Sequence, residues 1–241
     1  MIDFASVRAE LLAPHQIESR LAERSVVYVP VGSLEYHQEH LPIGLDALNA
    51  HGVCLATALA HGGVVLPPLF YGTGGGHLSY PWTIMSEDST AIRFLIELTL
   101  KKLEHQGVGV AVIFTGHFAD EQLDMIHQIA SDWNLSGSKL RAVSASVNMP
   151  LSAELPAPDH AGIFETTLLA NFWPETVHLE KLPPVETNPR NDLDDDQYGL
   201  HRHNADNPLR GIFGPDPRGI DMSNRQDLLA ALVEQLSKLS S

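Results

Sequence analysis

The stretch SVVYVPVGSLEYHQEHLPIGLDA, residues 25–47, joins an apolar run to a loop that is crowded with acids and histidines. The run Val26–Val29 is continuously apolar rather than alternating, which is typical of a strand buried on both faces of a parallel sheet. Glu35, His37 and Asp46 follow it in the loop. Such a loop is either a solvated surface segment or one half of a metal site. The residues in the rest of the chain distinguish these two interpretations.

Strands and helices alternate along most of the chain. We predict further strands at 64–70, 108–114 and 140–147, and helices at 47–61, about 86–105, about 120–133, 161–172 and 226–239, with Ser86 or Asp88 and then Asp120 as candidate N-caps. This order gives βαβ units and predicts an α/β fold, a single domain over residues 1–241 with a mostly parallel sheet flanked by helices. The Pro- and Asp-rich segment 174–217 is predicted to be mostly loop, with one extra strand as an option.

Composition narrows the class of function. The chain has 15 Lys and Arg against 30 Asp and Glu, a net charge of −15 that repels nucleic acid and anionic membranes. No apolar stretch approaches the ~20 residues that span a bilayer. The N-terminus lacks a secretory pattern, and the single Cys54, which we expect to be buried and inert, excludes an intrachain disulfide. We therefore predict a cytoplasmic protein with a small-molecule substrate and no nucleic-acid or membrane partner.

Acids and histidines follow three of the predicted strands. In open parallel sheets, ligands bind at the carboxyl ends of the strands. Glu35 and His37 follow the first strand, His77 follows the second across a Gly-rich loop, and His117 follows the third. Carboxylates and imidazoles are the usual mixed ligands of zinc and manganese. A carboxylate such as Asp46 has two oxygens and can bridge two ions about 3.5–4 Å apart.

Three motifs, in this order, resemble the signatures of the creatininase (creatinine amidohydrolase) family. They are PVGSLEYHQEHLPIGLDA (30–47), TGHFAD (115–120) and HAGIFETT (160–167), and the segments YGTGGGHLSYPWTI (71–84) and GIFGPDPRGI (211–220) also lie where the family has comparable ones. The resemblance covers nearly the whole chain. It implies a hydrolase with two divalent metal ions, zinc or manganese with iron as a further option, and a homo-oligomer that is often a hexamer.

The resemblance also implies a role for each matching residue. Glu35 and His37 match ligands of the two different metals, and Asp46 matches the carboxylate that bridges them. His117 matches the histidine ligand of the second signature, and Glu165 matches a glutamate at or beside the metals. His160 matches the residue that donates a proton to the leaving nitrogen. His40 is a candidate structural histidine behind the ligands, and His77 and Phe118 are candidate residues of the substrate pocket.

The reaction implied is metal-assisted hydrolysis of a C–N bond in a small, cyclic amide, with a hydroxide bridging the ions as nucleophile. Two departures count against creatinine itself. Ala119 stands where creatinine-cleaving members carry a metal-binding glutamate, and the segment 155–159 lacks their tryptophan. One alternative is that the same metal centre opens a cyclic polyol ketone or lactone. Another is a non-catalytic scaffold that keeps the fold and loses one metal or both.

Each candidate residue also has a purely structural interpretation. Asp46 could be the N-cap of the helix that follows it, and Glu165 could pair with a surface cation. His117 could be a capping histidine or one that only supports the ligands, and His160 could be an ordinary residue of a first helical turn. The Asp192–Asp196 run is most simply a solvated loop. A nucleotide-binding loop at 71–77 is disfavoured, because it lacks the Gly-Lys-Ser/Thr ending of a P-loop.

Overall fold

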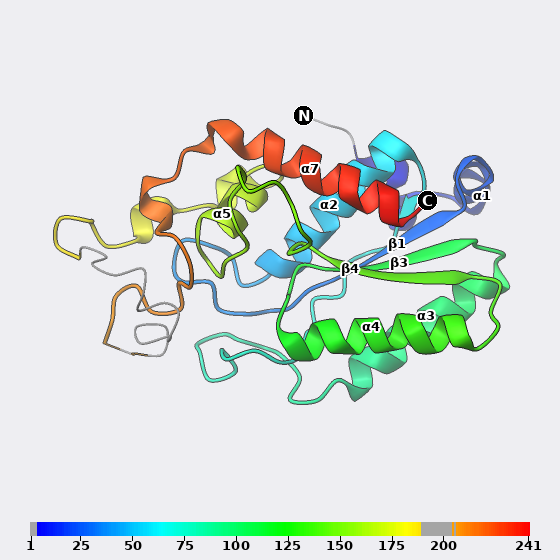
Figure 1. Ribbon diagram of the computed structural model, residues 1–241, viewed down its shortest axis with the longest axis horizontal. Coiled ribbons are helices and arrows are strands. Elements are labelled where there is room, and N and C mark those ends of the chain that lie inside the picture. Colours follow the sequence, from blue (N-terminus) through cyan, green and yellow to red (C-terminus); the bar gives the residue numbers. More distant parts are fainter. Residues whose placement is uncertain (1–3, 189–203, 205) are drawn as a thin grey trace.

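A four-stranded parallel sheet forms the centre of the molecule (Figure 1). The computed structural model describes residues 4–188, 204 and 206–241. The strands lie in the order β2-β1-β3-β4, and they are β1 (Val26–Val31), β2 (Val64–Val65), β3 (Val110–Thr115) and β4 (Arg141–Ser146). Val31 at the end of β1 pairs with Thr115 at the end of β3, so the carboxyl ends of these two strands are level.

Helices follow or precede each strand, as the alternating pattern predicts. The α-helices are α1 (Pro14–Glu23), α2 (Leu45–His61), α3 (Thr90–His105), α4 (Asp120–Leu135), α5 (Ile163–Leu169) and α7 (Arg225–Leu239). Short 3₁₀ helices occur at Ala5–Val7, Ala9–Leu11, Pro174–Thr176, Leu179–Lys181, Pro217–Gly219 and Met222–Asn224. The predicted fold class, an α/β domain with a parallel sheet flanked by helices, is confirmed. Helix α1 was not among the predicted elements.

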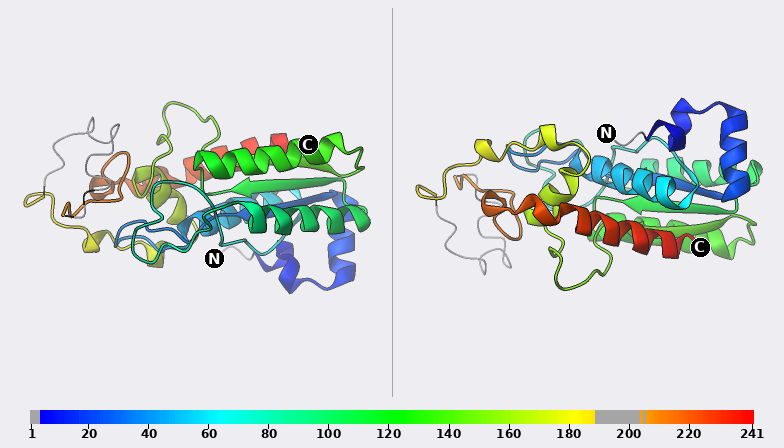
Figure 2. Two further views of the ribbon diagram at one scale, coloured as in Figure 1. Left: turned by 90° about the horizontal axis from the view of Figure 1, so that it is seen from below. Right: turned by 90° about the horizontal axis from the view of Figure 1, so that it is seen from above.

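Both faces of the sheet are covered, which explains why β1 is apolar at every position. On one face, Val26 and Tyr28 pack in a core with α2, α5 and α7. On the other face, Val27 and Val31 pack against α3 and α4. Figure 1 shows α2 and α7 above the strands and α3 and α4 below them, and Figure 2 shows the molecule from each of these two sides. All six residues of β1 are buried, as expected for a central parallel strand.

The second strand is shorter than predicted. Only Val64–Val65 pairs as a strand, although Leu66 and Leu69 still donate backbone hydrogen bonds to Tyr28 and Pro30 of β1. Pro67 and Pro68 lie between these two leucines. Proline has no N–H to donate, so the pair interrupts the ladder that the apolar run 64–70 predicts.

None of the residues predicted as N-caps occupies that position. The N-cap of α3 is Ser89 rather than Ser86 or Asp88, although the Asp88 carboxylate accepts the N–H of Thr90 at 2.8 Å. Asp120 is not a cap, because Ala119 occupies that position and Asp120 is the first residue of α4. Ser86 forms backbone contacts with the Gly-rich loop instead.

The predicted extra strand falls in a segment that is only partly described. Its described part carries 3₁₀ helices and an isolated antiparallel bridge between His160 and Phe213. The Asp192–Asp196 run lies outside the described residues. No helix in the described ranges is long and apolar enough to cross a membrane.

Candidate metal centre

The carboxyl ends of β1 and β3 support the first turn of α2. A Cβ atom at Gly32 would lie 2.1 Å from the backbone nitrogen of Ala47, and one at Gly116 would lie 1.9 Å from the carbonyl oxygen of Asp46. Only glycine permits these approaches. The two glycines therefore let the helix begin directly above the strand ends, and they place Asp46 between the loops that follow β1 and β3.

Asp46 lies between two histidines, one on each side of its carboxylate. Its Oδ1 is 3.2 Å from His37 Nε2, and its Oδ2 is 3.2 Å from His117 Nδ1. Ser33 donates its hydroxyl hydrogen to Oδ2 at 2.5 Å. Burial alone would raise the pKa of Asp46, but His37 and His117 outweigh it and hold the pKa below its usual range. Gly44 occupies the N-cap of α2, so the capping interpretation of Asp46 is wrong.

Two groups of potential metal ligands share this aspartate. Glu35, Asp46 and His117 form one group, and His37, Asp46 and Glu165 form the other, with the ligand atoms of each group within 4.8 Å of one another. A third group combines Glu35 and His37 with His160. All five residues that the sequence predicts as metal ligands are thus brought together by the fold.

Several buried atoms in these groups lack hydrogen-bond partners among the described residues. They are Glu35 Oε2, His37 Nε2 and His117 Nε2. Glu35 Oε2 lies 2.9 Å from His117 Nδ1, and His37 Nε2 lies 3.5 Å from Glu165 Oε2. Buried polar atoms normally find partners. Lone-pair atoms that face one another without hydrogen-bond geometry are what a cation site requires, so the donor set fits divalent metal ions.

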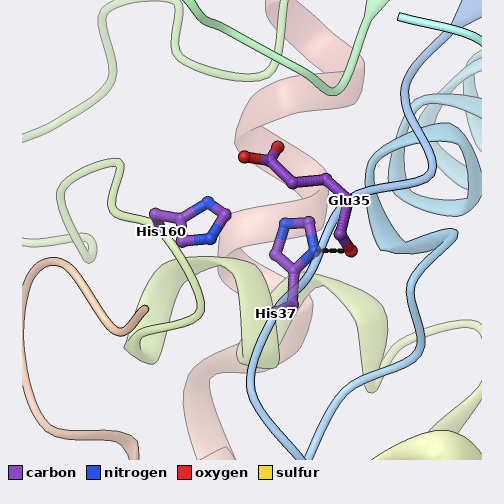
Figure 3. Close-up of side chains that lie close together, drawn as sticks. All are labelled: Glu35, His37 and His160. Carbon is purple, nitrogen blue, oxygen red and sulfur yellow. Dashed lines mark hydrogen bonds between the residues drawn. The ribbon is translucent and has the colours of Figure 1, made fainter. Parts of the chain in front are cut away.

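His37 is oriented as a metal-binding histidine would be (Figure 3). Its Nδ1 lies 2.9 Å from the carbonyl oxygen of Glu35, so Nδ1 carries the hydrogen and donates it. In the neutral ring, which a metal requires, Nε2 then presents its lone pair to Asp46 and Glu165. Burial disfavours a charged imidazole, but these carboxylates raise the pKa of His37 to about 10. The same carboxylates would stabilise a metal cation at this place.

Helix α5 is positioned by Asp159, a residue that the sequence patterns did not single out. Its Oδ2 accepts the N–H of Phe164 at 2.8 Å, and its Oδ1 accepts those of Gly162 and Glu165 at 3.3 Å each. The side chain of Glu165 then turns back, and its Oε2 accepts the N–H of Ala161 at 2.6 Å. Asp159 and Ala161 thus fix the carboxylate of Glu165 next to His37. Burial raises the pKa of Asp159 to about 7.

The ring of His160 lies over the ligand groups. Its Nε2 is 3.1 Å from the carbonyl oxygen of Tyr36, which makes Nε2–H the donor and leaves Nδ1 as the acceptor in the neutral ring. The ring centroid is 4.4 Å from that of His37 and 4.1 Å from that of His77. Burial, followed by the charge of His37, holds the pKa of His160 well below its usual range. Figure 3 shows the rings of His37 and His160 facing one another beside Glu35.

The two predicted pocket residues occupy different places. Phe118 lines a cavity of about 530 Å³ that opens onto the ligands, together with Glu35, His117, His160 and Glu165. His77 is fully buried beside Glu35, and its Nδ1 pairs with Glu35 Oε1. Its contact is therefore with a ligand rather than with the cavity, and its predicted contact with substrate stays a prediction.

His40 lies behind the ligands, as its structural interpretation predicts. Its Nε2 is 3.4 Å from the hydroxyl oxygen of Thr166, the residue after Glu165. Burial, and then the charge of His37, lower the pKa of His40 to about 3, so the ring is neutral. Ser33, like Asp159, was missed, although its position two residues before Glu35 is a signal that could have identified it.

Comparisons with known proteins identify the family of this chain. A family model described as Creatininase, creatinine amidohydrolase, matches residues 10–240. Creatinine amidohydrolase of Pseudomonas putida is 27% identical over 195 residues, which cover 70% of this chain and 74% of that protein. The 3-dehydro-scyllo-inosose hydrolase of Thermotoga maritima is 26% identical over 221 residues, which cover 83% of this chain and 70% of that protein.

Solved structures show the same fold. A crystal structure of creatinine amidohydrolase (creatininase) matches with a TM-score of 0.73 at 23% identity, covering 97% of this chain and 96% of that one. Further structures with this fold are described as a manganese creatininase and as a zinc–zinc form of a mutant creatininase. Because the family model spans almost all of the sequence, the chain belongs to the creatininase family of metal-dependent amidohydrolases.

Proposed function

We propose that this chain holds two divalent metal ions and hydrolyses a C–N bond in a small, cyclic amide. The observation that carries the proposal is the position of Asp46, whose two oxygens face different ligand groups. Glu35 and His117 would complete one metal site, and His37 and Glu165 would complete the other. When bound, divalent ions polarise a substrate carbonyl and lower the pKa of water to about 7.

The protein's own groups supply orientation and proton transfer. Ser33 holds Asp46, the Glu35 carbonyl fixes the tautomer of His37, and Asp159 positions the helix that carries Glu165. His160 Nε2 is fixed by the Tyr36 carbonyl, so His160 would accept and release a proton at Nδ1. A positioned general acid–base of this kind contributes ~10²–10⁴-fold in rate.

With Ala119 in place of a glutamate, Glu165 would have to supply the third ligand of the site that contains His37. Glu165 stands close enough to His37 and Asp46 to serve as the third ligand there, so the glutamate that creatinine-cleaving members carry at this position is not needed. Ala119 itself lines the cavity. The small side chain leaves room above the ligands that a glutamate would fill, which favours a substrate other than creatinine.

A second candidate function is hydrolytic opening of a cyclic polyol ketone by the same centre. The Thermotoga maritima relative, described as 3-dehydro-scyllo-inosose hydrolase, aligns with 83% of this chain. Both reactions need a polarised carbonyl and a general acid–base beside the metals. They differ in the bond that is broken, so screening with lactams, cyclic polyol ketones and lactones separates them.

We also infer a zinc or manganese enzyme that works as a homo-oligomer in the cytoplasm. Related creatininase structures carry these two metals. Large apolar side chains are exposed on the loop before α3 and on α3 itself, among them Tyr71, Trp82 and Phe94. Where exposed apolar side chains adjoin, they form the kind of patch that marks a protein–protein contact. Size-exclusion chromatography with light scattering tests the oligomeric state.

Elemental analysis of the purified protein tests the metal centre. We expect about two transition-metal ions per chain, because the two ligand groups share one carboxylate. Glu35→Ala and His117→Ala remove ligands of one group and should lower the metal content. His105→Ala is a matched control, because His105 is exposed at the end of α3. No metal, even after reconstitution with zinc or manganese, would contradict the proposal and favour the scaffold alternative.

A further inference from the structure

The cavity above the ligands has an acidic rim formed by Asp120 and Glu121. These are the first two residues of α4, and both side chains are exposed to solvent while lining the cavity. The buried floor of the same cavity carries Glu35 and Glu165. No lysine or arginine occurs among the described residues that line it. A molecule that enters therefore meets carboxylates from the rim to the floor.

Glu121 is held in place over the Gly-rich loop. Its Oε2 accepts the N–H of Gly75 at 3.2 Å. A Cβ atom at Gly74 would lie 2.4 Å from the same oxygen and 2.6 Å from the Cβ of Glu121, so the glycine lets the loop pack closely against this side chain. The hydrogen bond to Gly75 thus holds the exposed Glu121 carboxylate at the cavity wall, and it does not use Oε1. Acidic residues in a first helical turn also stabilise the helix. Helix stabilisation alone, however, requires neither a position on the cavity nor a hydrogen bond to Gly75.

Metal loading leaves the rim negative. The three negative charges of the ligand carboxylates Glu35, Asp46 and Glu165 would be more than offset by two divalent ions among them. Asp120 and Glu121 belong to neither ligand group. The loaded cavity would consequently combine a floor that no longer carries net negative charge with a mouth that stays negative.

We propose that the substrate of this site carries a positive charge, as an ammonium, amidinium or guanidinium group, which pairs with the acidic rim while the scissile carbonyl lies over the metals. This inference rests on the proposed function and narrows its substrate class. The one cavity contains both the rim and the floor, so a single small molecule can reach both. Substrates that carry a carboxylate or a phosphate are repelled at the same place.

Three hydroxamates of matched shape and different charge test the proposal. Hydroxamates bind divalent ions through two oxygens, whatever the natural substrate is. β-Alanine hydroxamate, butyrohydroxamate and succinate monohydroxamate place an ammonium, a methyl or a carboxylate at the same distance from the chelating group. Their dissociation constants for the metal-loaded, full-length protein are measured by calorimetry. We expect the cation to bind about fivefold more tightly than its neutral isostere, the range of an exposed ion pair, and the anion to bind more weakly than both.

The double variant Asp120→Asn/Glu121→Gln assigns the effect to the rim. It should bring the ratio of cationic to neutral affinity close to one and leave the affinity for butyrohydroxamate unchanged. Asp124→Asn/Glu175→Gln is the matched control, because it removes the same charges from exposed residues that do not line the cavity. The ratio should also fall between 20 mM and 500 mM salt, since salt screens exposed charges.

Each result decides between separate conclusions. An unchanged ratio in the rim variant, equal binding of all three probes, or tighter binding of the anion overturns the inference and leaves the metal centre intact. Absence of hydroxamate binding to metal-loaded protein overturns it as well, because the cavity would then give no access to the ions. Failure to bind metal, established beforehand by elemental analysis, overturns the proposed function itself.

Discussion

Replacing Asp46 with asparagine removes the negative charge at the point where the two ligand groups meet. The amide keeps the shape of the side chain but offers one oxygen where the carboxylate offers two. We expect metal content to fall to one ion or fewer per chain and turnover to fall by at least ~10²-fold. Elemental analysis and activity are measured together, with the exposed Asp124→Asn as control. Wild-type values for both would show that Asp46 is not a shared ligand.

His51, which belongs to neither ligand group, should make the folding stability of the protein sensitive to acid. It is buried on α2, and its Nε2 has no hydrogen-bond partner among the described residues. Burial, followed by the charge of Arg8, lowers its pKa from 6.5 to about 4. The folded state therefore favours the neutral ring. Its contribution to stability is complete above pH 6.5 and is lost progressively as the pH falls from 6.5 through 4.

The variant His51→Gln should lack this dependence. Between pH 7 and pH 4.5 the wild type should lose about 1–2 kcal/mol more unfolding free energy than the variant does. Urea unfolding at both pH values measures the difference, and the ligand carboxylates contribute equally to both proteins. Equal acid losses in wild type and variant would show that His51 binds its proton as readily in the folded state as in the unfolded one.

Among individual residues, the sequence identifies the candidate metal ligands better than it identifies the residues that position them. Glu35, His37 and His117 follow predicted strands, so the topology of a parallel sheet is enough to bring them together. Ser33 and Asp159 act through short hydrogen bonds whose geometry depends on the local turn of the backbone. Asp159 precedes a helix of only seven residues, which is too short to show a clear periodic pattern.

Among the elements, the contact between the strand ends and α2 controls the site. Gly116→Ala would place a methyl group 1.9 Å from the carbonyl oxygen of Asp46, so the first turn of α2 has to move. We expect a loss of about 2–3 kcal/mol in unfolding free energy, together with lower metal content. Chemical denaturation and elemental analysis measure the two effects.

Gly219→Ala is the control for this substitution. A Cβ atom there would have no neighbour within 4 Å, and we expect a change within about 0.5 kcal/mol. Normal metal content in a stable Gly116→Ala protein would mean that α2 can begin elsewhere without moving Asp46.

The elements themselves differ in how well the sequence predicts them. The long buried runs of β1 and β3 and the periodic helices α3 and α4 are correctly identified, because burial on both faces or one face fixes their patterns. The strand predicted at 64–70 is wrong beyond Val65. An apolar run predicts a buried strand, but Pro67 and Pro68 lack the N–H groups that a strand needs for its hydrogen bonds. The placement of Asp120 as a cap failed by one residue, the usual uncertainty at a helix end.

For the whole molecule, metal binding and folding stability should be linked. Without cations, Glu35, Asp46 and Glu165 bring three carboxylates together in the interior. Ions that bind only the folded state add about 4 kcal/mol at a concentration of 1,000 times Kd, which is on the order of 10 °C in Tm for a chain of this size. Thermal unfolding before and after chelation, and after return of zinc or manganese, measures this shift. Asp46→Asn should show little of it, and an equally large shift in that variant would place the stabilising ions elsewhere.

The position of α7 has a consequence for the synthesis of this protein. Leu228, Leu232 and Leu236 of α7 are fully buried and close the core over α2 and the sheet. Each such side chain contributes about 2 kcal/mol by leaving water. A nascent chain that already contains every proposed metal ligand still lacks this cover, because α7 follows all of those ligands in the sequence. Folding of the domain is therefore completed only after α7 has left the ribosome, and until then one face of the core is open to chaperones and to aggregation.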